Sequence, residues 1–349
     1  MSIYAVAGLL LSIPVGRSIR TGQVKAAILF GLIAMLMGNL LCLIDPSSEW
    51  LFLCGRLLEG VSYTIMGVVG PVIINRQAPP QRYPLVISLL SLWIPVGQIA
   101  AALINAALIG SFGWQGVWWS GVVFTLATLL WASRIRLPEF TSPVMDPGRS
   151  GNALFRQEWV ALITVTAVFM LWTGQYYAYM TWLPQYLIER HGLTLSASIL
   201  GYLAPVFVIV VVNLLTGALL RAGVRIGSLF AFGATLQAIT WWLTPLTDSP
   251  VWGLMSLVAY GIAAGISPTC LFGMAGLIVG RSGATATGWG FVMSGRNVGV
   301  LFGPILIGYL FNHLGSWNGV SPVFGLLTSL AAAGAFLLAY QFRKYGYYQ

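Results

Sequence analysis

Residues 16–22 read GRSIRTG and residues 217–223 read GALLRAG, so the pattern Gly-x-x-x-Arg-x-Gly occurs twice, 201 residues apart. Each copy follows an apolar stretch. Gly97 in IPVGQIAAAL and Gly299 in GRNVGVLFGP repeat at nearly the same offset, 202 residues. Several matches at one offset, inside corresponding apolar stretches, indicate that the chain contains two duplicated halves.

The apolar stretches are suited to crossing a membrane. Of the 349 residues, 58% are hydrophobic and only 7% are charged, against about 25% charged in an ordinary soluble domain. A bilayer core about 30 Å thick takes roughly 20 apolar residues as helix, and a helix satisfies its own backbone groups. The sequence therefore predicts an all-α polytopic membrane protein. Eleven apolar segments run over residues 3–16, 26–44, 50–74, 85–109, 117–132, 159–187, 196–220, 227–246, 251–279, 288–311 and 320–341.

The longest connection divides these segments into five and six. Residues 1–132 form the predicted first half, residues 133–158 a polar linker, and residues 159–349 the second half. Of the 17 Lys and Arg, 14 lie in alternate connections and at the C-terminus. Because short cytoplasmic loops carry the excess of basic residues, we expect this set, the linker and the C-terminus to be cytoplasmic. We expect a monomer in the inner cell membrane.

The repeat also makes a prediction about the start of the chain. Trp159 opens the second half, and the position 201 residues earlier would precede Met1. Two equal halves therefore predict a further span and loop of about 40 residues ahead of Met1. We expect the chain as given to lack its first helix.

Several motifs resemble the major facilitator superfamily. The pattern Arg56-Leu-Leu-Glu59-Gly60 is similar to the family's Arg-x-x-(Gln/Glu)-Gly motif, and residues 16–25 are similar to its loop between helices 2 and 3, although the usual Asp is missing. The stretches SLWIPVGQ, FGWQGVWW and TWLPQYLIERHG resemble the bacterial cyanate and nitroimidazole transporter-like branch. The resemblance implies two pseudo-symmetric six-helix halves that rock around a central site.

Three charged residues lie well inside apolar segments, where a charge is costly and needs a reason. Arg56 and Glu59 are three residues apart, so they share a helix face and can pair. Such a pair either senses protons and positions helices or is a structural ion pair. Arg296 has no acidic residue near it in sequence. Its planar, permanently charged fork of donors favours a small anion such as a carboxylate, although it could also bond backbone carbonyls.

An aromatic stripe gives a second set of candidates. Trp172, Gln175, Tyr176 and Tyr179 fall on one face of a helix, and such a face with polar tips could line a binding cavity. The alternative is an aromatic belt at the membrane surface.

The arginines shared by the two repeated loops, Arg20 and Arg221, are candidates for gating together with Arg56 and Glu59. Arg56 is also a candidate for substrate binding, together with Arg296 and the aromatic stripe. No cofactor or metal is expected, because Cys42, Cys54 and Cys270 have no metal-binding spacing. The net charge of +9 is spread in small groups, so nucleic acid is not an expected partner.

The sequence thus favours a secondary transporter of a small solute, with a small organic or inorganic anion as the first interpretation and proton coupling as an open question. Efflux of a neutral or lipophilic compound is the alternative within transport. A transport-inactive sensor or scaffold is the alternative of another class. An enzyme is not expected, because no nucleophile–base set gathers on one side of the membrane.

The basic-loop rule predicts which sites are accessible from outside. Single cysteines placed at Ser47, His191, Asp248 and Asn318 should react with an impermeant thiol reagent added to intact cells. A cysteine at Ser150 should react only after the cells are opened. Ready external labelling at Ser150 would reverse the predicted orientation.

Overall fold

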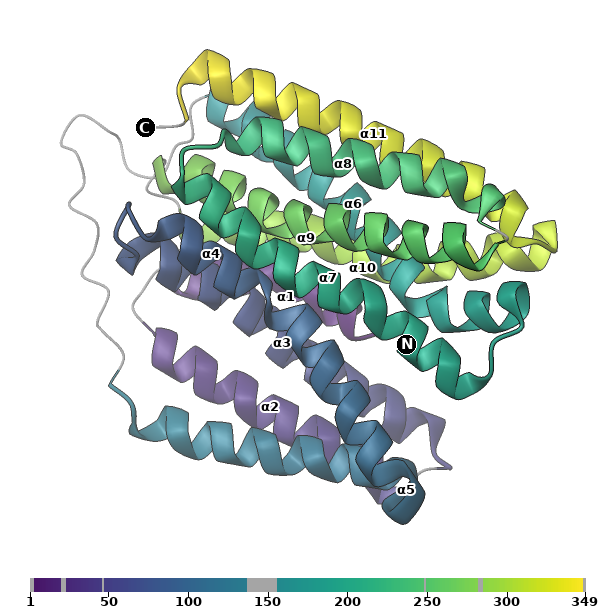
Figure 1. Cartoon of the computed structure of the whole chain (residues 1–349). Coiled ribbons are helices and arrows are strands. Elements are labelled where there is room, and N and C mark those ends of the chain that lie inside the picture. The colour runs from purple at the N-terminus through teal and green to yellow at the C-terminus, as the bar shows by residue number, and fades with distance from the viewer. Residues whose placement is uncertain are drawn as a thin grey trace.

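The computed structural model describes residues 3–19, 23–45, 47–136, 156–247, 249–281 and 285–347. These residues form one bundle of long helices (Figure 1). The elements in chain order are α1 (Tyr4–Ser18), α2 (Val24–Ile44), α3 (Glu49–Gln77), α4 (Tyr83–Ser91), α5 (Trp93–Arg134), α6 (Arg156–His191), α7 (Leu195–Arg221), α8 (Ile226–Leu243), the 3-10 turn η2 (Thr244–Leu246), α9 (Pro250–Arg281), α10 (Thr285–Leu314) and α11 (Trp317–Tyr345).

The all-α membrane class is confirmed. Nine helical segments within the described residues are long and apolar enough to cross a bilayer. Helix α1 is apolar but shorter, with 15 residues. The predicted count of eleven spans is reached if α1 is counted as a span and the stretch from Tyr83 to Arg134 is counted as two spans.

That stretch is divided at two points. Gly113 has a φ of 61° and a ψ of −164°, which is non-helical backbone that favours glycine. The chain reverses there, as Figure 1 shows at the α5 label, in the connection that the sequence predicted over residues 110–116. The predicted segment 85–109 is also interrupted, between α4 and α5. Pro95 has no N–H to donate to the Ser91 carbonyl, which weakens the helix at this point.

Polar side chains start several helices at the end of the bundle that carries Trp317. Ser48, Thr194 and Ser316 precede α3, α7 and α11, and each hydroxyl accepts a hydrogen bond from a backbone N–H three residues on. Such N-caps satisfy donors that the first helical turn leaves free. At the opposite end, Lys25 at the start of α2 donates to the carbonyls of Ser133 and Ile135, at 2.8 and 2.9 Å.

The centre of the bundle consists of α6, α10 and α1 packed at short range. Helix α10 lies against α6 on one side and α1 on the other. A Cβ at Gly299 of α10 would overlap the Met170 carbonyl oxygen and the Thr173 hydroxyl of α6, and one at Gly303 would overlap the Gly174 carbonyl. Small residues therefore let these backbones approach closely, as in other membrane helix pairs.

Contacts between the helices of residues 3–134 and those of residues 156–345 join the two predicted halves. Besides α1 with α10, helices α4 and α5 pack on α7. At the Lys25 end, Asn75 donates from Nδ2 to the Gly276 carbonyl at 2.9 Å, and the Tyr83 hydroxyl donates to Asn75 Oδ1 at 2.7 Å. These hydrogen bonds connect α3 and α4 to α9 at this end of the bundle.

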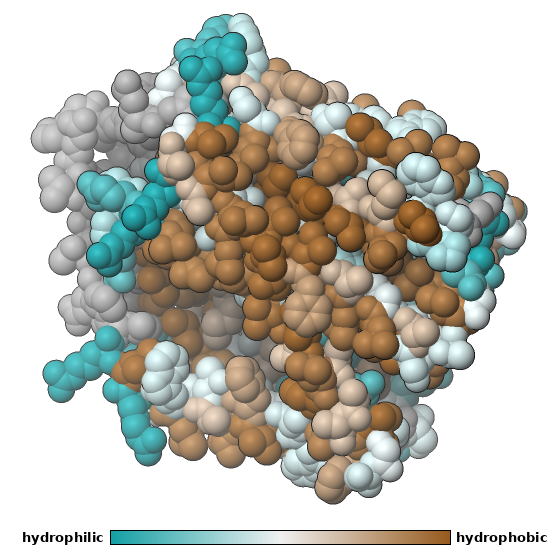
Figure 2. All heavy atoms as spheres, in the orientation of Figure 1, coloured by the Kyte–Doolittle hydropathy of each residue, from teal (hydrophilic) through white to brown (hydrophobic). Residues whose placement is uncertain are grey.

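The outer surface is what a lipid-facing bundle requires. In Figure 2 hydrophobic residues cover the middle of the visible face, and hydrophilic residues lie toward its left and right edges. Large apolar side chains such as Phe124, Leu200 and Phe336 are more than half exposed. The molecule is thus a multi-pass membrane protein. Most of its polar side chains lie in the interior of the bundle or at its two ends.

The two glycines that match in the repeat should tolerate a methyl group very differently. Gly299→Ala forces a Cβ into the α6 backbone, and overpacking of this kind typically costs about 1–3 kcal/mol. A Cβ at Gly97 meets no atom within 4 Å. We expect Gly299→Ala to lower the Tm of the purified protein in detergent by several degrees, and Gly97→Ala to leave it unchanged. Equal Tm values for the two variants would show that α6 and α10 are not packed as described.

Candidate functional site

Arg296 lies at the centre of the bundle and is fully enclosed. It stands on α10, between α6 and the first-half helices, and its side chain is 1% exposed. It donates hydrogen bonds to the Tyr177 hydroxyl at 3.3 Å and to Asn297 Oδ1 at 3.5 Å. Both are long compared with the usual 2.7–3.2 Å. No Asp or Glu among the described residues pairs with it.

Aromatic rings enclose the guanidinium. The Arg296 Cζ lies 5.3 to 6.0 Å from four ring centroids, those of Tyr63, Trp93, Phe169 and Tyr177. A desolvated cation over an aromatic face gains about 2 kcal/mol. Ring faces, however, offer no strong acceptor for the five N–H groups of a guanidinium. The rings therefore stabilise the charge of Arg296 while its hydrogen-bonding capacity stays largely unused.

A narrow cavity adjoins this arginine and lies between the two sets of helices. Its lining includes Arg296, the first-half residues Ser91 and Trp93, and the α6 residues Phe169, Trp172 and Tyr176. The Tyr176 hydroxyl donates to Gln98 Oε1 of α5 at 3.2 Å, and the hydroxyls of Tyr63 and Tyr177 lie 3.1 Å apart. The site is thus built from helices of both predicted halves, and its arginine is buried.

The predicted stripe on α6 is divided between different surroundings. Trp172 and Tyr176 line the narrow cavity, with their rings stacked at 5.1 Å. Tyr179 lines a wider cavity toward the Trp317 end, among α6, α7, α9 and α11. Gln175 is 1% exposed and is engaged in the interior of the second half. Its Oε1 accepts from Trp241 Nε1 at 2.8 Å and from the Tyr260 hydroxyl at 3.1 Å.

Several residues around Arg296 were not predicted from the sequence. Tyr63, Trp93 and Tyr177 all face the guanidinium, and they come from three different helices. Tyr177 directly follows the predicted Tyr176, and on α6 one residue corresponds to a rotation of about 100°. A helix that is aromatic on several faces does not reveal which face meets α10, so the sequence offered no signal that would select Tyr177.

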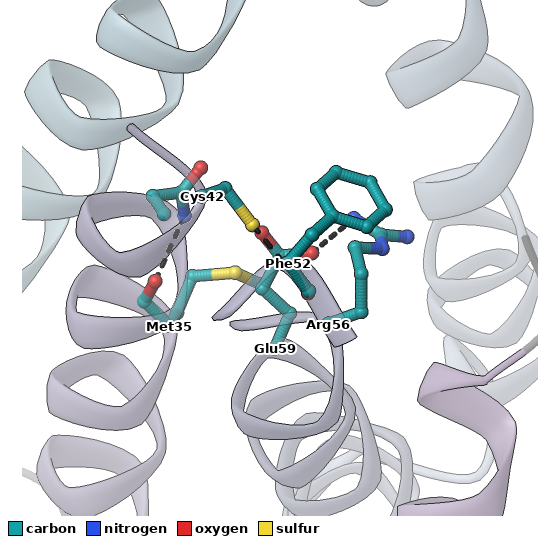
Figure 3. Close-up of polar contacts among 6 residues, drawn as sticks. Met35, Cys42, Phe52, Arg56 and Glu59 are labelled. Carbon is teal, nitrogen blue, oxygen red and sulfur yellow. Dashed lines mark hydrogen bonds and ion pairs between the residues drawn. The ribbon is translucent and has the colours of Figure 1, made fainter. Parts of the chain in front are cut away.

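Arg56 and Glu59 form the ion pair that their spacing predicted. The Arg56 guanidinium donates to Glu59 Oε2 within α3, and Figure 3 shows the two side chains facing each other near Cys42 of α2. Arg56 also lies over the rings of Tyr4 and Trp118, 5.6 and 5.7 Å from their centroids. Glu59 is 6% exposed, and its Oε1 has no partner among the described residues.

Two tyrosines connect this ion pair to Arg296. The Tyr4 ring, which lies beneath Arg56, meets the Tyr63 ring edge-on at 5.2 Å. The Tyr63 ring in turn lies beneath Arg296. Arg56 and Arg296 are thus linked by the contacts of two intervening side chains.

The remaining candidates lie elsewhere. Arg221 is exposed at the C-terminal end of α7, at the same end of the bundle as Asn75 and Gly276, and Arg20 lies outside the described residues. Within the described ranges, no three His, Cys, Asp or Glu side chains gather in a way that could hold a metal ion.

Known proteins are similar to this chain in sequence and in fold. A family model described as Major Facilitator Superfamily matches residues 1–294. A curated relative, the putative niacin/nicotinamide transporter NiaP of Bacillus subtilis (strain 168), is 25% identical over 355 aligned residues, covering 89% of this chain and 82% of that protein. The fold is similar to the fucose:proton symporter FucP of E. coli, with a TM-score of 0.73, 15% identity and 97% and 88% of the two chains covered. It is also similar to the human organic anion transporter MFSD10, with a TM-score of 0.77, 16% identity and 97% and 82% covered.

The ion pair in α3 should be costly to break on one side only. Arg56→Leu leaves a buried carboxylate without its partner, which typically costs about 3–5 kcal/mol, whereas replacing both charges by apolar residues is often neutral. We expect Arg56→Leu to lower the Tm in detergent strongly and the double variant Arg56→Leu/Glu59→Leu to recover most of it.

Uptake by the double variant in proteoliposomes then separates the two interpretations of the pair. Normal uptake by a stable double variant would assign the pair a structural role only. A stable double variant that no longer accumulates solute would assign it a role in coupling. A single Arg56→Leu variant as stable as the native protein would contradict the pairing itself.

Proposed function

We propose that this chain, which belongs to the Major Facilitator Superfamily and is a secondary transporter of a small solute rather than an enzyme, carries a small anion bound at Arg296. Its many apolar helices place it in a membrane as a multi-pass protein. The proposal concerns which solute chemistry the central site accepts.

The observation that most supports an anion is that the Arg296 guanidinium is buried and has no acidic side chain among the described residues to accept its hydrogen bonds. The guanidinium stays charged at any physiological pH, and moving a charge out of water costs several kcal/mol even after relaxation. Arg296 is 1% exposed, and its hydrogen-bonding partners among the described residues are neutral, with long bonds to the Tyr177 hydroxyl and to Asn297 Oδ1 and the Tyr63 hydroxyl nearby. A carboxylate would supply two charged oxygens in the fork geometry that a guanidinium matches. A neutral solute could offer acceptor oxygens but no opposite charge.

The names of similar proteins support an organic solute. The relative from Bacillus subtilis is named for niacin and nicotinamide, and the human protein of similar fold is titled an organic anion transporter. We therefore prefer a small organic anion to an inorganic one. The cyanate and nitroimidazole transporter-like branch, which the sequence resembles, is also named for small solutes.

The proposed mechanism is alternating access, in which two halves rock around a site near the bilayer midplane. Contacts of α1 with α10 and of α4 with α7 are the surfaces on which the halves would turn. Opening toward the Lys25 end requires the hydrogen bonds of Asn75 to Gly276 and of Tyr83 to Asn75 to break. An anion at Arg296 would contact both halves, so its binding can favour one arrangement over the other.

We further propose that Arg56 and Glu59 contribute to coupling. Glu59 is the one described carboxylate that lies deep inside a spanning helix, and its neighbours across the packing are Cys42 of α2 and, through Arg56, Tyr4 of α1 and Trp118 of α5. Proton binding at this carboxylate would release Arg56 toward Tyr4.

The setting of the protein is part of the proposal. The basic connections at the Lys25 end support a cytoplasmic location for that end and for the C-terminus. We propose that the protein works as a monomer in the inner cell membrane, with a small solute and lipid as its partners and no nucleic acid.

Substitutions at Arg296 test the anion directly. Arg296→Lys keeps a charge but loses the planar fork, and charged hydrogen bonds contribute about 1.5–3 kcal/mol each. We expect uptake of the anionic solute by proteoliposomes to fall about tenfold or more with Arg296→Lys and to vanish with Arg296→Ala. Arg343→Ala, which changes an exposed arginine at the end of α11, should leave uptake unchanged. Full affinity and rate in a folded Arg296→Ala variant would favour a neutral or lipophilic solute instead.

A further inference from the structure

We infer that the wider cavity near Trp317 is a second binding site, which takes an uncharged, largely apolar ring compound that enters from the lipid. The site lies inside the second half and apart from Arg296, so this inference goes beyond the proposed function. It rests on the size and lining of the cavity, on a groove beside it, and on the wall that separates it from the narrow cavity.

The wider cavity is large enough for a small organic molecule. Its volume is about 370 Å³, and ligand pockets typically have volumes of about 300–1,000 Å³. It lies at the end of the bundle where α11 begins, at the right in Figure 1. Leucine side chains and aromatic rings form most of its wall, and the rings belong to Tyr179, Trp182, Tyr186, Trp241 and Trp317. Such a wall favours a ligand that contains a ring.

Most polar groups of this wall are already engaged with the protein. The indole N–H groups of Trp182, Trp241 and Trp317 each donate a hydrogen bond, at 2.8 to 3.1 Å. The hydroxyls of Tyr186 and Thr247 lie 2.9 Å apart. These groups therefore do not need a ligand to satisfy them, and the surface that they leave is apolar.

The polar groups left for a ligand are neutral hydroxyls. Tyr179 and Ser256 line the cavity and are partly exposed, and their hydroxyls have no hydrogen-bond partner among the described residues. A hydroxyl can donate or accept a hydrogen bond. Arg190 is exposed at the C-terminal end of α6, and the described lining contains no acidic side chain. An uncharged ligand with a carbonyl or a hydroxyl group matches this set.

A groove on the lipid-facing surface adjoins the cavity. It lies between the end of α8 and the start of α9, has a volume of about 530 Å³, and is lined mostly by apolar side chains. Two of them, Trp252 and Met255, are 59% and 54% exposed. Thr247 and Ser256 line both the groove and the cavity. A compound dissolved in the lipid would enter sideways at these two residues. This route selects against charge, because an ionised group is costly to move through apolar surroundings.

Hydrogen-bonded side chains separate the wider cavity from the narrow one. Trp241, which lines the wider cavity, donates to Gln175. Trp172, which lines the narrow cavity, donates to Gln237 Oε1 at 2.9 Å. Gln175 and Gln237 are 1% and 0% exposed. The wall of the wider cavity contains no residue of the described helices of 3–134. A ligand there touches only the second half, so its binding should not depend on Arg296.

Photolabelling with benzophenone tests the site. Benzophenone is uncharged, carries two rings and a carbonyl, and attaches to nearby C–H groups on irradiation. Leu183 and Leu257 line the cavity and are only 2% and 8% exposed. With the whole chain in lipid nanodiscs, we expect saturable labelling of these two residues, located by peptide mass spectrometry. We expect labelling there to be about tenfold weaker or less with 4-benzoylbenzoate, which adds a carboxylate.

Two results would overturn the inference at this stage. Labelling that rises without saturation and follows the exposure of side chains to lipid would show that the cavity holds no such compound. Equal labelling by benzophenone and 4-benzoylbenzoate would show that the site does not require an uncharged ligand.

Substitutions with a matched control locate the ligand. Ser256→Phe fills the junction of groove and cavity, and we expect saturable labelling to be lost. Ser111→Phe makes the same change at an exposed serine of α5 that lines neither space, and labelling should be unchanged. Tyr179→Phe keeps the ring that stacks on Tyr260 but removes the hydroxyl, which should raise the half-saturating concentration about threefold to tenfold. Native labelling in both Ser256→Phe and Tyr179→Phe would place the ligand outside this cavity.

Arg296→Ala separates this inference from the proposed function. The substitution removes the proposed anion site and leaves the wider cavity untouched, so benzophenone labelling should stay native while anion uptake is lost. Loss of saturable labelling in a folded Arg296→Ala variant would show that the two cavities act as one site, and would overturn the inference. Unchanged anion uptake in that variant, with native benzophenone labelling, would contradict the proposed function alone.

Discussion

A permanently charged guanidinium enclosed in an apolar helix bundle is the constraint on which the structure depends. Arg296 cannot lose its proton, and it has little access to water or to an acidic partner in the described structure. Four aromatic rings partly offset this cost. We propose that a ligand supplies the remaining hydrogen-bond acceptors, which would make the site selective for negative charge.

The close packing of three helices places that charge where both halves meet. Gly299 and Gly303 allow α10 to lie directly on α6, and Ser294 and Asn297 connect α10 to α1 through hydrogen bonds to Leu9 and Ser12. Arg296 therefore sits on a rigid element, as a binding site requires, while the cavity beside it is closed by Trp93 from the other half. In the proposed mechanism, binding and rearrangement of the two predicted halves would act on the same few side chains.

Sequence reasoning was sufficient for the features that depend on one helix at a time. Hydropathy predicted the helices, and the spacing of Arg56 and Glu59 predicted their ion pair. The isolation of Arg296 along the chain identified it as a candidate. The surroundings of Arg296 could not be predicted, because they depend on how α3, α5, α6 and α10 rotate against each other. Side-chain periodicity selects a face of α6 only when one face differs from the rest, and α6 carries aromatic residues on several faces.

The most direct test of the account is the position of a bound anion. A crystal structure of the protein with a brominated small organic anion that it transports would show the bromine by its anomalous signal. The account predicts an anionic oxygen of the ligand within hydrogen-bond distance of Arg296. A bromine found only in the wider cavity near Trp317, with Arg296 still without a ligand oxygen, would contradict it.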